Sequence, residues 1–247
     1  MIDISGKWVL VTGASRGIGK EIALALGKLG CNLVLHSRSI EHTKLLADDI
    51  ALKNTVRVIS VAADLSKPGQ VTDLVTEIKS AAPQIDIIYN NAGLMMPYNK
   101  DVWHIPGDDF RTSFEINVIS QVHICNAFIP SMIERRWGRV INLCSGIRDQ
   151  PQLAPYAVSK AAISKFTLDL ASTLRDSGVS INLLDPGWLR TDMGGPDAPN
   201  AVESVIPGAL VPALINCCVS GYEFSAQAYA GMVIQQAVKK AERAFCD

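Results

Sequence analysis

Apolar runs of strand length alternate with segments of helical period along most of this 247-residue chain. Short apolar runs are typical of strands buried on both faces of a parallel sheet, and amphipathic segments are typical of the helices that cover it. The predicted strands cover residues 7–13, 32–38, 56–65, 85–93, 138–145 and 179–187, and the predicted helices cover 20–30, about 40–53, 68–82, about 108–135 and a segment that includes 156–160. This alternation predicts an α/β fold with a doubly wound parallel sheet and helices on both faces.

The sequence contains no linker, repeat or low-complexity segment at which the chain would divide. Hydrophobic residues make up 48% of the chain and charged residues 19%, which suffices for a large core. We expect a single domain over residues 1–247, although this length would also allow two small ones. The segment 192–212 is the exception, because its glycines and prolines predict a loop or lid beside the substrate.

Charge and hydropathy exclude several classes of partner. The formal net charge is −1 and no basic block occurs, so we expect no nucleic-acid surface. Uninterrupted apolar runs of membrane-spanning length are missing, so no membrane contact is expected. The first residues run directly into a strand pattern and lack the features of a signal peptide, which predicts a cytoplasmic protein.

Cysteine and histidine spacing gives no sign of a metal site. The six cysteines form no Cys-x-x-Cys pair, and the four histidines form no His-x-x-x-His pair. In a chain of this length without a secretion signal, we expect reduced and mostly buried thiols instead of disulfides.

A glycine-rich stretch, "TGASRGIG" at 12–19, lies between the first predicted strand and the first predicted helix. Gly13 would allow a tight turn, Gly17 a close backbone approach, and Gly19 close packing of helix on sheet. The helix N-terminus then offers free N–H groups to a pyrophosphate. The spacing differs from Gly-x-Gly-x-x-Gly, but the position between strand and helix predicts a Rossmann-type nucleotide site.

The end of the second strand indicates which nucleotide binds. An acidic residue there would accept the free ribose 2′-hydroxyl of NAD, whereas a 2′-phosphate needs cations. The sequence has Ser37 and Arg38 and no acid, and Arg16 of the glycine loop can reach the same region. Two guanidinium groups suit a phosphate, so NADP(H) is the predicted cofactor; the alternative is that Arg38 is only a solvated side chain.

The stretch "YAVSK" places Tyr156 and Lys160 four residues apart on a predicted helix. Residues at this spacing share a helix face, where one side chain can alter the proton affinity of the other. Taken alone, the pair is an ordinary feature of a helix surface.

Seven motifs in order resemble the short-chain dehydrogenase/reductase family, from about residue 5 to about residue 232. They are "TGASRGIG", "AADL" (62–65), "NNAG" (90–93), "IN" ending at Asn117, "INLCS" ending at Ser145, "YAVSK", and "PGWLRTDM" (186–193). The resemblance implies hydride transfer between a nicotinamide and a carbonyl or secondary alcohol, of the 3-oxoacyl or small carbonyl reductase type. A sugar or polyol dehydrogenase of the same family is the main alternative, and a non-catalytic NADP(H) sensor is another.

The resemblance also implies a role for each matching residue. Asn117, Ser145, Tyr156 and Lys160 match the catalytic tetrad of the family. Tyr156 would move the proton, Ser145 would orient the substrate oxygen, and the charge of Lys160 would favour tyrosinate. Asn117 would hold a water that links Lys160 to solvent. The expected cofactor-binding residues are Gly13, Ser15, Arg16, Gly17, Ile18, Gly19, Ser37, Arg38, Asp64, Leu65, Asn91, Gly93, Tyr156, Lys160, Pro186, Gly187, Leu189 and Thr191.

The substrate and the assembly are less defined. The expected pocket-lining residues are Met95, Met96, Ile147, Gln150, Trp188 and Met193, while strand alternation places Cys144 in the core. No carboxylate or phosphate clamp is evident, so a neutral carbonyl, acyl thioester or polyol remains open. A homo-oligomer, dimer or tetramer, is expected. The final segment 233–247 departs from the family pattern, which leaves its role open.

Overall fold

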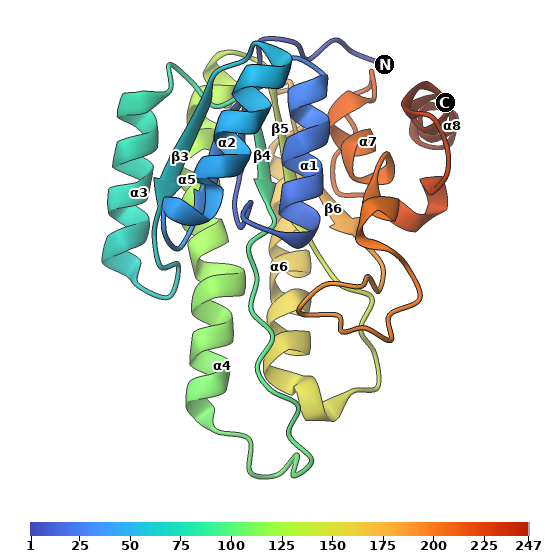
Figure 1. The fold of residues 1–247 in the computed structure, drawn as a ribbon. Coiled ribbons are helices and arrows are strands. Elements are labelled where there is room, and N and C mark those ends of the chain that lie inside the picture. The colour runs from blue at the N-terminus through green and yellow to red at the C-terminus, as the bar shows by residue number, and fades with distance from the viewer. Residues whose placement is uncertain (247) are drawn as a thin grey trace.

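The computed structural model describes residues 1–246 and contains a seven-stranded parallel sheet (Figure 1). The strand order is β3-β2-β1-β4-β5-β6-β7. The strands are β1 (Trp8–Val11), β2 (Asn32–Ser37), β3 (Val58–Ala62), β4 (Ile87–Asn90), β5 (Gly138–Leu143), β6 (Val179–Asp185) and β7 (Glu223–Ser225). The predicted doubly wound α/β fold is confirmed.

Helices cover both faces of the sheet. They are α1 (Gly17–Lys28), α2 (Glu41–Asn54), α3 (Pro68–Ala81), α4 (Gly107–Phe114), α5 (Ser120–Glu134), α6 (Ala154–Thr173), α7 (Val211–Leu214) and α8 (Ile234–Phe245). Alternate residues of β1 point to opposite faces, so Val9 and Val11 join the core beneath α1, α2, α7 and α8, and Leu10 joins the core beneath α3, α5 and α6.

The strand order reverses at β1, which pairs with β2 on one side and β4 on the other. Connections from these strands leave toward opposite faces of the sheet, so a crevice opens at their carboxyl ends. Ligands of doubly wound folds bind in such a crevice. The glycine loop after β1 and the segment after β4 both lie there.

The long helix predicted near 108–135 contains an irregular turn. Residues Glu115–Ile119 form a π-helical turn between α4 and α5, and Asn117 lies within it. Such turns arise where an α-helix takes up an extra residue, often at functional sites. By length and hydropathy alone, Gly107–Glu134 could cross a membrane, but in this structure α5 packs on α3 and α4 packs on α6.

The predicted loop over 192–212 is correct only for its first part. Short helices occupy Val202–Val205, Gly208–Leu210 and Val211–Leu214. Val205, Ala209 and Val211 are fully buried, and the Tyr89 hydroxyl donates a hydrogen bond to the Ala209 carbonyl at 3.0 Å. Local glycine and proline content predicted a loop, but long-range packing under α1 orders the segment.

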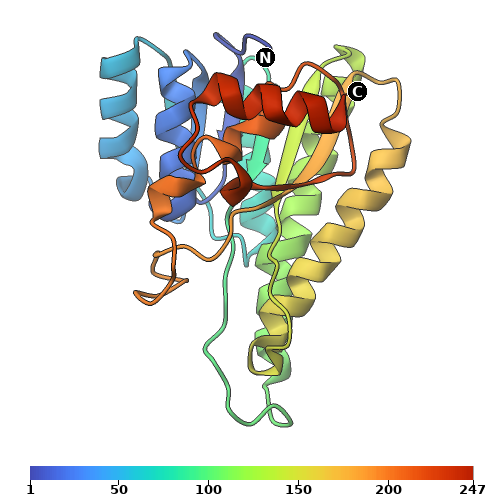
Figure 2. The same cartoon turned by 90° about the vertical axis from the view of Figure 1, so that its right-hand side faces the viewer.

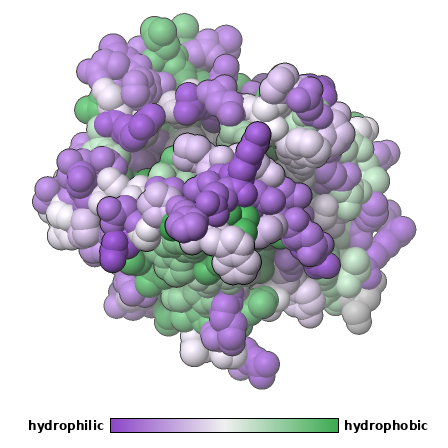
Figure 3. All heavy atoms as spheres, turned by 90° about the horizontal axis from the view of Figure 1, so that it is seen from below, coloured by the Kyte–Doolittle hydropathy of each residue, from purple (hydrophilic) through white to green (hydrophobic). Residues whose placement is uncertain are grey.

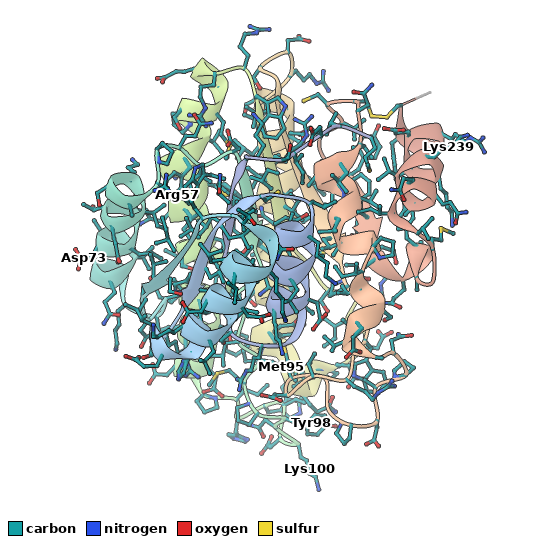
Figure 4. All side chains as sticks on the ribbon, turned by 45° about the horizontal axis from the view of Figure 1, so that its top comes forward. Arg57, Asp73, Met95, Tyr98, Lys100 and Lys239 are labelled. Atoms are coloured by element: carbon teal, nitrogen blue, oxygen red, sulfur yellow. A yellow bond between two sulfur atoms is a disulfide. The ribbon has the colours of Figure 1, made fainter. Side chains whose placement is uncertain are left out.

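The C-terminal segment forms α8, which lies across the outside of the molecule near the N-terminus (Figure 2). The Met1 amino group pairs with Glu242 at 2.8 Å, and the Phe245 ring packs on Phe224. A disulfide joins Cys217 to Cys246, so the expectation of reduced thiols was wrong for these two (Figure 4). Adjacent Cys218 is free and exposed, while Cys31, Cys125 and Cys144 are free and buried.

Candidate active site

The glycine loop leaves no room for a side chain at Gly13 or Gly19. A Cβ on Gly13, whose φ is +65°, would lie 2.9 Å from the Ala92 Cα, and a Cβ on Gly19 would overlap the Gly13 carbonyl oxygen. Among the described residues, no side chain caps the N-terminus of α1, so its first N–H groups are free to bind. A cradle that a Cβ would fill, at an uncapped helix N-terminus, fits a dinucleotide pyrophosphate.

Polar contacts across the sheet hold this loop in place. The Asn91 amide donates to the carbonyl oxygens of Thr12 at 2.7 Å and Gly13 at 3.1 Å. The Thr12 hydroxyl accepts the backbone N–H groups of Asn91 and Ala92, each at 3.0 Å. Sequence analysis singled out Asn91 but missed Thr12, whose role depends on β1 and β4 being neighbours.

The sequence also showed no sign of a role for His36, which links the carboxyl ends of β1, β2 and β3. Its Nδ1 accepts the Gly13 N–H at 3.3 Å, and its Nε2 lies 3.1 Å from the Ala63 carbonyl oxygen. Because a carbonyl oxygen only accepts, the proton must be on Nε2 and the ring must be neutral. Burial lowers the pKa of His36 to about 4, which keeps it neutral at physiological pH.

The residues expected to read the 2′-position differ in their surroundings. Arg38 is exposed at the end of β2. Hydrogen bonds from Ser66 are the main cause of the lowered pKa of Asp64, and the positive charge of Arg38 lowers this pKa further. Ser37 is buried and donates to the Ser39 carbonyl at 2.6 Å. Arg16 instead pairs with Asp192 at 2.7 Å, on the loop that follows β6. Sequence analysis did not foresee this pairing.

Lys160 and Asn117 lie together under the end of β4. A Cβ on Gly93 would be 3.5 Å from Asn117 Oδ1 and 3.6 Å from Lys160 Nζ. Asn117 exchanges hydrogen bonds with the Leu94 backbone and donates to the Ser159 hydroxyl at 2.9 Å. Lys160 is buried and donates to the Leu143 carbonyl at 2.7 Å. Desolvation lowers the pKa of Lys160 to about 8.

Ser145 and Tyr156 meet at the wall of a cavity of about 640 Å³. Burial raises the pKa of Tyr156, and the nearby Ser145 hydroxyl acts in the opposite direction. Lys160 Nζ lies 5.8 Å from the centre of the Tyr156 ring. Because desolvation dominates, the pKa of Tyr156 is raised, whereas the charge of Lys160 was expected to favour tyrosinate.

The cavity also includes most of the residues expected to contact substrate or nicotinamide. Its expected lining residues are Ile18, Met95, Ile147, Gln150, Pro186, Gly187, Trp188, Leu189, Thr191 and Met193, whereas Met96 is not part of the lining. Cys144 is buried as expected, but it also borders this cavity. Burial raises the pKa of the Cys144 thiol, which makes it a poor nucleophile.

The segment after β6 closes the cavity over the glycine loop. A Cβ on Gly17 would lie 3.5 Å from Thr191 Cγ2. The Gln227 amide donates to the Pro186 carbonyl at 2.9 Å and accepts from Ser204. Asp185 accepts the Gly187 N–H at 2.9 Å. Neither Gln227 nor Asp185 carried a signal in the sequence, since both act through contacts that the fold creates.

Comparison with known proteins identifies the family. Residues 7–201 match the short chain dehydrogenase family. The chain is 33% identical over 197 residues to the 3-oxoacyl-(acyl-carrier-protein) reductase FabG of Rickettsia bellii, a match that covers 78% of this chain and 77% of that protein. This protein therefore belongs to the short-chain dehydrogenase/reductase family, whose members are oxidoreductases that use a nicotinamide cofactor on alcohol or carbonyl groups.

Solved structures agree with this assignment. A 3-oxoacyl (acyl-carrier-protein) reductase from Agrobacterium tumefaciens C58 with NADP bound is 27% identical, with a TM-score of 0.81, and the match covers 90% of this chain and 93% of that one. An NAD+-bound xylitol dehydrogenase, 24% identical, shares the fold with a TM-score of 0.81 over 91% of this chain and 98% of that one. Members of this fold thus bind either cofactor.

Proposed function

We propose that this protein is an NADP(H)-dependent reductase of 3-oxoacyl or other small carbonyl compounds. The observation that carries the proposal is the shared cavity wall. Ser145 and Tyr156 both border the cavity, with buried Lys160 one helical turn along α6 from Tyr156. A phenol and a hydroxyl at the edge of one cavity can both reach a single carbonyl oxygen.

In the proposed mechanism the nicotinamide, when bound, supplies the hydride to the carbonyl carbon. Ser145 hydrogen-bonds the carbonyl oxygen and orients it. Tyr156 gives its phenolic proton to that oxygen as charge develops there, so the product is the alcohol. Lys160 then returns a proton toward Tyr156, and its pKa of about 8 makes this proton exchangeable near neutral pH. Asn117 holds the path from Lys160 to solvent, and the reverse steps oxidise an alcohol.

The proposed cofactor site follows the crevice from the 2′-phosphate to the nicotinamide. Arg38 and Ser37 would read the phosphate, with Arg16 joining them after it releases Asp192. The glycine loop would hold the pyrophosphate, and Asp64 and Leu65 would border the adenine. Asn91, Gly93, Pro186, Gly187, Leu189 and Thr191 would contact the nicotinamide half.

We also propose a single-domain, cytoplasmic protein that works as a homo-oligomer, without nucleic-acid or membrane partners. Members of the family commonly form oligomers. Apolar side chains gather in a patch on the face seen in Figure 3. Exposed apolar residues on the π-helical turn, α5 and α6 are Ile119, Ile133, Val158 and Leu168. Exposed apolar surface favours association with another protein surface.

The test is a spectrophotometric assay of the purified protein with NADPH and with NADH over a panel of ketones, aldehydes and 3-oxoacyl thioesters. The reverse reaction is assayed over polyols and simple alcohols. The proposal predicts the highest kcat/KM for a carbonyl substrate with NADPH. Turnover confined to sugars or polyols would support a polyol dehydrogenase instead, and cofactor binding without turnover of any substrate would support a sensor.

A further inference from the structure

Asp185 is a carboxylate at the wall of the cavity that the proposed mechanism does not use. It is the last residue of β6, is half-buried, and borders the cavity together with Ser145 and Tyr156. Its Oδ1 accepts the Gly187 N–H at 2.9 Å. Within residues 1–246, its Oδ2 accepts no hydrogen bond and makes no ion pair. This charged oxygen is therefore available to accept a hydrogen bond from a ligand or from water.

Gly146 allows this oxygen to lie beside the reacting groups. A Cβ on Gly146 would be 3.1 Å from Asp185 Oδ2, which is tighter than ordinary contact, so a side chain here would displace the carboxylate. Gly146 directly follows Ser145 in the chain. The negative charge of Asp185 also raises the pKa of Tyr156, which places the two groups within electrostatic reach.

In residues 1–246, no lining residue other than Gly187 donates a hydrogen bond to this carboxylate. Ile147, Leu153 and Met193 border the cavity with apolar groups, and Arg148 is the lining cation. In the described part of the chain, Arg148 forms no ion pair with Asp185 or any other acid. A substrate that fills the cavity would desolvate Oδ2, and an unpaired desolvated carboxylate is strongly unfavourable. A substrate O–H group directed at Oδ2 would remove that penalty.

We propose that Asp185 makes the enzyme selective for substrates with a hydroxyl group on the carbon beside the reacting carbon. Such substrates are α-hydroxy ketones in reduction and vicinal diols in oxidation. The hydroxyl donates its hydrogen bond to Asp185 Oδ2 while Ser145 and Tyr156 hold the neighbouring oxygen. This selectivity rests on the proposed function, because it requires carbonyl reduction at the same site.

The test compares two substrates that differ in one hydrogen-bond donor, α-hydroxyacetophenone and α-methoxyacetophenone. Both carry an oxygen that activates the carbonyl, but only the first can donate. A hydrogen bond to a charged group predicts kcat/KM roughly tenfold to a hundredfold higher for the hydroxy compound. In Asp185→Asn, which can still accept the Gly187 N–H, this ratio is expected to approach one. The matched control is Asp73→Asn, in an exposed residue of α3 at the outer edge of the molecule (Figure 4), which should keep the wild-type ratio.

A second measurement distinguishes a direct effect of the Asp185 charge on the active site from a purely structural role of this residue. The charged groups that face Tyr156 are Lys160 from α6 and Asp185 from β6, and the thiol of Cys144, which directly follows β5, is also near. Removing the charge at Asp185 should lower the pKa of Tyr156, so the pH of half-maximal alcohol oxidation should fall in Asp185→Asn.

The other possible outcomes would reject either the proposed selectivity or the proposed function. Equal rates for the two compounds in wild type would overturn the selectivity and leave the reductase function intact. An unchanged preference in Asp185→Asn, with a raised KM for the cofactor, would show that Oδ2 serves the nicotinamide amide and would also reject the proposal. Failure to reduce any carbonyl compound would reject the proposed function itself.

Discussion

The two sides of the crevice are held together in different ways. On one side, the cofactor cradle consists of residues 12–19, 36–38 and 91–93; on the other, the substrate wall consists of 186–201. In the cradle, Asn91 and His36 bond to backbone groups that lie 23 to 79 residues away. In the wall, Trp188 and Arg190 bond to carbonyl groups only 6 to 9 residues away.

This difference indicates on which side of the crevice the sequence can change without disturbing the fold. The cradle exists only if β1, β2, β3 and β4 are correctly ordered, so a change there disturbs the sheet as well as the cofactor. The wall is held partly by these internal bonds and partly by Gln227, which donates to Pro186, and Arg16, which pairs with Asp192. Because 59% of Trp188 is exposed, this residue can change with little effect on the fold. We infer that the cradle selects the cofactor and that exposed wall residues such as Trp188 and Met193 bear largely on substrate choice. The wall residues Pro186, Gly187, Leu189 and Thr191 would also contact the nicotinamide half of the cofactor.

The largest predicted effect removes the chemistry and leaves both sides of the crevice intact. In Tyr156→Phe only the phenolic oxygen is lost, so turnover should fall by about 10²–10⁴-fold. Cofactor affinity, measured by fluorescence titration, should stay near the wild-type value. Lys160→Ala should lose both turnover and cofactor affinity, because Lys160 is both a member of the proposed proton path and an expected cofactor-binding residue. A Phe variant within a few-fold of wild type would rule out the tyrosine as proton donor.

The next predicted effect is a pH dependence of protein stability that arises from His36 in the cradle. The folded pKa of His36, about 4, lies below the usual 6.5, so the unfolded chain takes up a proton first as the pH falls. The contribution of neutral His36 to stability is therefore fully present above pH 6.5. It is lost as the pH falls from 6.5 to 4, which lowers the free energy of unfolding by about 3 kcal/mol. Urea unfolding across this range should show a flatter dependence in His36→Gln.

His42 provides the control for that experiment, since it is exposed on α2. The variant His42→Gln should keep the wild-type dependence on pH. If His36→Gln and wild type lost the same stability between pH 6.5 and 4, then His36 would not be the group that titrates, and its place between the three strands would need revision.

A smaller effect compares two glycines that differ in their surroundings. A Cβ on Gly19 would overlap the backbone of the cradle, whereas a Cβ on Gly69, in α3, would meet nothing within 4 Å. Gly19→Ala should reduce the free energy of unfolding by about 1–3 kcal/mol and weaken cofactor binding. Gly69→Ala should leave binding unchanged and raise stability slightly, by up to about 1 kcal/mol. Equal behaviour of the two variants would contradict the close fit of the cradle.

On both sides of the crevice, the sequence predicted what local patterns carry and missed what depends on distant contacts. Strand and helix periods are local signals, so the order of elements and the glycine loop were found directly. The pair Tyr156 and Lys160 gained meaning only from the motifs that surround it in the sequence. Thr12, His36 and Asp185 act through partners that only the fold brings near, so nothing in their neighbourhood along the chain marks them. The helices at 202–214 were missed because tertiary packing overrides glycine and proline content there.

The central claim is that the cradle reads a 2′-phosphate, and the ratio of kcat/KM for NADPH and NADH tests it most directly. We predict that wild type prefers NADPH and that losing Arg38 weakens NADPH by roughly ten- to a hundredfold while NADH changes little. Ser37→Asp combined with Arg38→Ala should reverse the preference, because the new carboxylate repels the phosphate and accepts a 2′-hydroxyl. A wild-type enzyme that prefers NADH would contradict the account before any substitution is made.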